Sequence, residues 1–236
     1  VRTPGEHSRR ELFDLWKHHE EIEAMSKLVN DAYLTLKPYV PGKPVSETER
    51  ELGISGCVKL ASNENPLGPS PKAVAAIQEA LTTLHDYPDG GAFYLKQKLA
   101  SFLNVEQEQL LFGNGTNELL EMIIRTCMRP EDNIVYAQSS FIVYKLVSMA
   151  IGAEIREVPL KEMRYDLPAI AEAMDDKTKL IFIANPNNPT GSYITKDELD
   201  AFLEAIPETT LVVMDEAYFE YVDAEDYPNG LDYLPK

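Results

Sequence analysis

The sequence predicts an α/β fold in which a mainly parallel sheet carries helices on both faces. Two observations predict it: short apolar runs alternate with amphipathic segments of helical length, and polar motifs close the last two apolar runs. The predicted strands lie near residues 109–112, 133–137, 154–158, 180–184 and 210–214. Because a helix separates successive strands, it returns the chain to the start of the next strand, and neighbouring strands run parallel.

A helix is predicted to begin directly after Ser70. Ser70 is a favourable N-cap residue, and Pro71 suits the first helical position. The apolar residues of this helix recur at helical spacing and predict a buried stripe made of Val74, Ile77 and Leu81.

A glycine-rich turn joins the next apolar run to its helix. The run Leu110–Phe112 is followed by Gly113-Asn114-Gly115-Thr116-Asn117-Glu118. Glycines at such a turn allow backbone N–H groups to approach an anion, and the helix N-terminus adds a favourable dipole. A plain strand–helix connection has the same composition, so this motif by itself is a weak sign of an anion site. The helix carries a broad apolar face made of Leu119, Leu120, Ile123, Ile124 and Cys127.

An aromatic residue follows the next strand. The run Ile134–Ala137 precedes a helix predicted over Phe141–Ile151. Phe141, at the start of that helix, is either an ordinary core aromatic or a flat surface for a ring-shaped ligand. Tyr144, one turn later, is expected in the core or in a cleft wall rather than in contact with a ligand.

The C-terminal part of the sequence predicts a strand–helix–strand unit. The strands are Leu180–Ala184 and Leu211–Met214, and the helix between them covers Thr195–Ile206. Thr195 and Glu198 form a capping box, which marks the start of the helix. One face of this helix is apolar and consists of Leu199, Phe202, Leu203 and Ile206.

Polar motifs follow both of these strands. Asn185-Pro186-Asn187-Asn188-Pro189-Thr190-Gly191 follows the first, and Asp215-Glu216-Ala217-Tyr218 follows the second. Ordinary turn chemistry explains either motif alone. Open parallel sheets bind their ligands at the carboxyl ends of the strands, so both motifs on successive strands predict a binding site there.

These motifs, in this order, resemble the class I and II aminotransferases, which are fold-type I enzymes dependent on pyridoxal 5'-phosphate (PLP). The resemblance implies that Asp215 lies beside the ring nitrogen of PLP, where a carboxylate favours the protonated form. It implies that Asn188 and Tyr218 donate hydrogen bonds to the ring oxygen and that Phe141 stacks on the ring. The residues that would hold the phosphate are Gly115, Thr116 and Asn117.

From about Lys27 to the last residue, the sequence is similar to the histidinol-phosphate aminotransferase family. The segments that carry this similarity are 36–44, 59–71 and 87–89. The resemblance implies that Tyr39 faces the substrate and that Asn63 lies at the entrance of the active site. It also implies a homodimer, in which Tyr87 reaches the PLP phosphate of the partner subunit.

The sequence departs from the family pattern in one respect. The lysine that forms the Schiff base should follow Asp215 by roughly thirty residues, in a Ser-Lys pattern. Lys236 lacks that pattern, so we expect the catalytic lysine and the substrate-binding arginines to lie beyond it. We therefore expect the chain by itself to be inactive and its sheet to be incomplete at the C-terminal end, with an unpaired strand edge.

The resemblance also divides the chain. Residues 25–65 correspond to the N-terminal arm and a small-domain contribution, and residues 66–236 correspond to the PLP-binding large domain. Residues 1–24 are an extension with helical spacing of apolar residues. It is either an added helix or unrelated upstream sequence.

Charge and composition limit the function classes. The 236 residues contain 22 Lys and Arg against 39 Asp and Glu, which gives 22 − 39 = −17. Such an acidic chain is not expected to bind nucleic acid or an anionic membrane. Cys57 and Cys127 have no metal-binding spacing, and no metal site is expected. Two unrelated thiols suggest a reducing compartment, so we expect the cytoplasm.

The sequence therefore predicts that the whole protein transfers an amino group between histidinol phosphate and 2-oxoglutarate, a step of histidine biosynthesis. Two alternatives stay open. One is another fold-type I enzyme, either an aromatic-amino-acid aminotransferase or a threonine-phosphate decarboxylase. The other is a non-catalytic remnant, if the natural chain ends at Lys236.

Overall fold

The computed structural model describes residues 29–39 and 42–234, so the predicted helix within residues 1–24 lies outside it. Its contacts divide the chain into two units. The smaller unit is residues 38–111, and the larger unit combines the stretch that ends at residue 37 with the stretch that begins at residue 112. The two units are described separately. The domain boundaries expected from the sequence, 25–65 and 66–236, stay a prediction.

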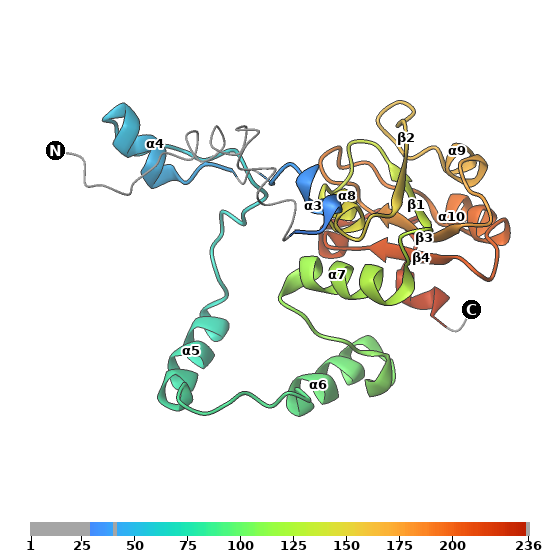
Figure 1. Cartoon of the computed structure of the whole chain (residues 1–236). Coiled ribbons are helices and arrows are strands. Elements are labelled where there is room, and N and C mark those ends of the chain that lie inside the picture. The colour runs from blue at the N-terminus through green and yellow to red at the C-terminus, as the bar shows by residue number, and fades with distance from the viewer. Residues whose placement is uncertain (1–28, 40–41, 235–236) are drawn as a thin grey trace. The chain divides into compact units, whose positions relative to one another are not determined.

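The larger unit contains a four-stranded parallel sheet with the strand order β2-β1-β3-β4 (Figure 1). The strands are β1 (Asn133–Ala137), β2 (Glu154–Val158), β3 (Thr178–Ala184) and β4 (Leu211–Asp215). The four predicted strands from residue 133 onward are therefore confirmed to within two residues. β1 and β3 lie in the middle of the sheet, which explains why nearly every residue in them is buried.

Helices cover both faces of this sheet, as predicted. The unit contains α3 (Asp31–Leu34), α7 (Gly115–Cys127), α8 (Val143–Ala150), α9 (Leu167–Glu172) and α10 (Lys196–Glu204). Alternate residues of β3 face opposite sides: Ile181 and Ile183 pack with α9 and α10, whereas Leu180 and Phe182 pack with α7 and α8. The period of two in a strand thus builds two apolar cores from one segment.

The caps predicted from the sequence set the helix boundaries. Thr195 is the N-cap of α10, and its hydroxyl accepts from the backbone N–H of Glu198 while the Glu198 side chain accepts from that of Thr195. The predicted helix 141–151 begins two residues later, at Val143, and Phe141 lies ahead of it.

The smaller unit contains helices and no strand among its described residues. Its elements are α4 (Val45–Leu52), α5 (Pro71–Ala80), η1 (Leu81–Thr83), α6 (Phe93–Leu103) and η2 (Gln107–Gln109). Ser70 is the N-cap of α5 and Pro71 its first residue, as predicted.

Two predictions for this part of the chain are wrong. Residues 109–112 do not form a strand, because a strand needs a hydrogen-bonded neighbour and no described segment pairs with them. The stripe of Val74, Ile77 and Leu81 is not buried: these side chains are 37%, 63% and 55% exposed. Helical spacing specifies an apolar face, but burial also requires a surface that packs against it.

Among the described residues, no helix combines the length and apolar character needed to cross a bilayer.

Candidate functional site

The two polar motifs predicted to form a site lie side by side at the carboxyl edge of the sheet. Ala184 and Asp215 are partners in the β3–β4 register. One residue farther, the backbone N–H of Asn185 donates to the carbonyl of Asp215 at 2.9 Å. The parallel pairing therefore brings the asparagine-rich loop and the acidic motif to one place.

The loop after β3 is fixed by its own buried amide groups. The Nδ2 of Asn187, which is 2% exposed, donates to the carbonyl of Ser139 at 3.2 Å and to Thr190 Oγ1 at 2.8 Å. The Oδ1 of Asn185 accepts from the backbone N–H of Ile194 at 2.8 Å. These two asparagines hold the loop, and Asn188, the residue predicted to contact PLP, lies half-buried between them and Thr190.

A buried tyrosine that the sequence analysis did not identify connects this loop to the segment before α8. The Tyr165 hydroxyl accepts from the backbone N–H of Ala184 at 3.0 Å and lies 2.7 Å from Ser140 Oγ. Ser140 Oγ in turn donates to Asn187 Oδ1 at 3.0 Å. Burial raises the pKa of Tyr165 to about 12, so its hydroxyl keeps its proton near neutral pH. This chain of hydrogen bonds fixes the position of Phe141 relative to β3.

Asp215 is held at both carboxylate oxygens. Tyr144 donates from its hydroxyl to Oδ2 at 2.7 Å, and the backbone N–H of Ala217 donates to Oδ1 at 3.3 Å. Tyr144 is a core residue, as predicted, but its hydroxyl contact with Asp215 was not foreseen. The two residues are 71 positions apart, so no local pattern in the sequence connects them.

Glu216 belongs to a different set of contacts. Its carboxylate accepts from the backbone N–H of Gly230 at 3.0 Å, and the Tyr227 hydroxyl, which donates to the carbonyl of Asn185, lies 3.5 Å away. Burial raises the pKa of Glu216 above its ordinary value. This residue ties the segment around Gly230 to the end of β4.

The predicted phosphate cradle is the first turn of α7. Gly115 has a φ of +71°, which favours glycine, and a Cβ added there would meet no atom within 4 Å. Thr116 and Asn117 lie in this first turn, where helix geometry leaves backbone N–H groups without an intrahelical acceptor. An anionic group already lies at this end: Glu118 Oε2 accepts from the backbone N–H of Asn114 at 2.5 Å. The space at Gly115 and the N–H donors of this turn suit an anion, and a phosphate there would compete with the Glu118 carboxylate for the backbone N–H of Asn114.

The described contacts do not test the roles of the other predicted site residues. Tyr39, Asn63 and Tyr87 are exposed and belong to the separately described smaller unit. Tyr87 is fully exposed, at 100%. Tyr218 lies three residues after Asp215 and is half-buried. The roles of these four residues stay predictions.

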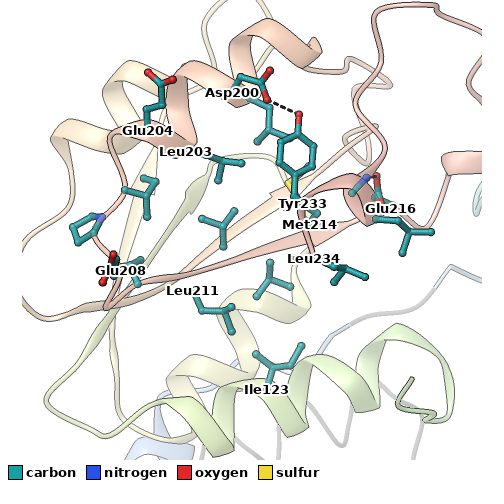
Figure 2. Close-up of a pocket in the computed structure, with 18 residues that line it drawn as sticks. Ile123, Asp200, Leu203, Glu204, Glu208, Leu211, Met214, Glu216, Tyr233 and Leu234 are labelled. Carbon is teal, nitrogen blue, oxygen red and sulfur yellow. Dashed lines mark hydrogen bonds between the residues drawn. The ribbon is translucent and has the colours of Figure 1, made fainter. Parts of the chain in front are cut away.

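A separate groove lies along the free edge of β4 (Figure 2). It has a volume of about 1200 Å³ and is lined by Leu211 and Met214 of β4, Leu203 of α10 and Ile123 of α7. Tyr233 donates to Asp200 Oδ1 at 2.7 Å on one wall. Apolar side chains make up much of the lining, together with the carboxylates of Asp200, Glu204, Glu208 and Glu216. Among the described residues β4 pairs only with β3, so its other edge is unpaired, as expected.

We expect residues 1–236 expressed alone to associate or aggregate. β4 ends the sheet, and Leu211 on it is 48% exposed, so a free strand edge lies next to apolar side chains. Sedimentation velocity over a range of concentrations, with and without PLP, measures this. A monomer that stays monodisperse at every concentration would contradict the expectation.

Comparisons with known proteins give matches over most of the chain. The model of the family aminotransferase class I and II matches residues 55–232. A histidinol-phosphate aminotransferase from Moorella thermoacetica is 49% identical over 227 residues, or 96% of this chain and 58% of that protein. Histidinol-phosphate aminotransferase 2 from Pseudomonas fluorescens is 53% identical over 201 residues, or 84% of this chain and 54% of that protein.

A solved structure shows the same fold. The histidinol-phosphate aminotransferase from Sinorhizobium meliloti, in complex with pyridoxal-5'-phosphate, matches with a TM-score of 0.77 and 29% identity. The match covers 86% of this chain and 55% of that one. The chain thus spans little more than half the length of the relatives it matches.

Proposed function

The chain belongs to the aminotransferase class I and II family, and from that premise we propose that the whole protein is a PLP-dependent aminotransferase acting on histidinol phosphate and 2-oxoglutarate. The observation that carries the reaction class is the position of Asp215, held by two donors at the carboxyl edge of β4 beside the asparagine-rich loop. The substrate is supported by relatives named histidinol-phosphate aminotransferase at about half identity.

The residues at the site fit PLP. When bound, PLP supplies an electron sink for the charge that develops next to the reacting amino group. Asp215 would place a fixed negative charge beside the ring nitrogen and keep a proton on it. Asn188 and Tyr218 would donate to the ring oxygen, and Phe141 would cover one face of the ring. The first turn of α7, at Gly115–Asn117, would bind the phosphate through backbone N–H groups.

An assay of the whole protein with histidinol phosphate and 2-oxoglutarate tests this proposal. We expect glutamate to form, and PLP addition to the purified protein to give a visible absorbance band. If the protein transaminates phenylalanine or tyrosine but not histidinol phosphate, the proposed reaction class stands and the proposed substrate is rejected. Decarboxylation of threonine phosphate would reject transamination, and the absence of any PLP binding would reject the proposal altogether.

We also propose a homodimer in which Tyr87 completes the partner's site. Its full exposure leaves the hydroxyl available to a second subunit.

The two free cysteines, Cys57 and Cys127, support a cytoplasmic protein.

Mixed dimers test the role of Tyr87. Tyr87→Phe damages the partner's site, whereas Asp215→Ala damages its own, so a mixed dimer contains one intact site. We expect co-refolding the two variants to recover about a quarter of wild-type activity, since about half of the dimers are mixed and one site of two is intact. If Tyr87 acts within its own subunit, every site stays damaged and mixing recovers nothing.

A further inference from the structure

Tyr144 connects two of the residues that are expected to contact the PLP ring, Asp215 and Phe141. It lies on α8, is 0% exposed, and its hydroxyl donates to Asp215 Oδ2 at 2.7 Å. Its ring meets that of Phe141 edge-on, with centroids 5.8 Å apart and planes at 86°. One buried side chain thus contacts both the proposed counter-charge and the proposed stacking residue.

The Tyr144 ring has little freedom to move. It stacks on Phe182 of β3 at a centroid distance of 4.6 Å with planes only 10° apart. Tyr136 of β1 meets it edge-on at 5.9 Å. Contacts on the face and on the edge fix the ring, so the hydroxyl is directed at Asp215 before any ligand binds.

The Tyr144 hydroxyl also stays a donor across the neutral range. Burial raises its pKa above the ordinary value, and the charge of Asp215 raises it further. Burial, and to a lesser degree the charge of Asp215, also raises the pKa of Tyr165 and of Glu216. A permanently protonated hydroxyl therefore faces Asp215 Oδ2.

We propose that Tyr144 is a positioning residue, which sets the orientation of the Asp215 carboxylate through its hydroxyl and the placement of Phe141 through its ring. The inference rests on the proposed function, because it assigns Tyr144 a role in a PLP site. It predicts that the hydroxyl matters for binding the ring nitrogen and that the ring matters for packing.

Tyr144→Phe separates the two roles, since it removes the hydroxyl and keeps the ring. Tyr136→Phe is the matched control: Tyr136 is 3% exposed, packs in the same cluster, and donates at 2.7 Å to Glu157 instead. Both variants, made in the whole protein, lose one buried hydroxyl with a carboxylate partner. Only Tyr144→Phe changes the surroundings of Asp215.

We expect Tyr144→Phe to weaken PLP binding to the cofactor-free protein by about tenfold, the effect typical of losing a hydrogen bond to a charged group. Binding of 1-deaza-PLP, which has carbon in place of the ring nitrogen, should change less than twofold. kcat should fall by a similar factor of about ten, with KM for histidinol phosphate nearly unchanged. Tyr136→Phe should leave all of these within about twofold of wild type.

A double-variant cycle completes the test. If Tyr144 acts through Asp215, adding Tyr144→Phe to Asp215→Ala should cause no further loss of PLP affinity. The inference would be overturned if Tyr144→Phe weakened the binding of PLP and of 1-deaza-PLP equally. Equal effects of Tyr144→Phe and Tyr136→Phe on PLP binding would also overturn it and leave Tyr144 a packing role only. Failure of the proposed function is recognised separately, because the wild-type protein would then neither bind PLP nor transaminate.

Discussion

Replacing Asp215 with alanine should lower the kcat of the whole protein by about 10³-fold or more, while the yield of folded protein changes little. The substitution removes a carboxylate that two hydrogen bonds hold at this edge of the sheet, one from the Tyr144 hydroxyl and one from the backbone N–H of Ala217. Without that charge, the protonated ring nitrogen loses its partner, and the developing negative charge is less stabilised. Steady-state kinetics with saturating PLP, alongside a thermal unfolding curve, measure both effects.

Asp175 provides the matched control, since it lies before β3 at the opposite edge of the sheet. Its carboxylate accepts from Asn133 Nδ2 at 2.8 Å and from Arg156 Nη2 at 2.5 Å. The hydrogen bond from Asn133, followed by that from Arg156, lowers the pKa of Asp175 to about 2. A lowered pKa means that this carboxylate stabilises the fold above its ordinary pKa of 3.8 and that the stabilisation disappears as the pH falls towards 2.

Asp175→Ala should therefore lower the melting temperature at neutral pH and keep kcat. Asp215→Ala should instead lower kcat and leave the melting temperature nearly unchanged. A near-normal kcat for Asp215→Ala would show that this residue is structural and that the assignment of the ring pocket is wrong.

Phe182→Ala should lower the free energy of unfolding by about 3–5 kcal/mol. Phe182 is fully buried in the central strand β3, and the substitution leaves a cavity under the ring of Tyr144. Because Tyr144 stacks on this side chain, PLP affinity should fall as well. Urea unfolding and a PLP titration of the same sample measure the two quantities.

Phe202→Ala separates the loss of stability from the loss of PLP affinity. Phe202 of α10 is 4% exposed and packs on the other face of the sheet, away from Tyr144. Its loss should destabilise the protein by a similar amount but leave PLP affinity of the remaining folded protein unchanged. A destabilisation by Phe182→Ala of less than about 1 kcal/mol would contradict the packing described for β3.

The features that the sequence by itself determined are local. The strands 133–137 and 180–184 follow from apolar runs, and the start of α10 follows from the capping box of Thr195 and Glu198. These signals depend on residues only a few positions apart in the sequence. The polar motifs after β3 and β4 were predicted to meet because parallel strands end at the same edge.

The tertiary structure decided the features that depend on strand order, register and packing partners. The hydrogen bond from Tyr144 to Asp215 and the chain through Tyr165, Ser140 and Asn187 join segments tens of residues apart. Two local patterns were not enough by themselves. The apolar run at residues 109–112 has no strand neighbour among the described residues, and the apolar face of α5 has no described surface that buries it. A periodic pattern specifies which side chains share a face, but burial and hydrogen bonding across the fold require a second surface, whose position only the folded chain provides.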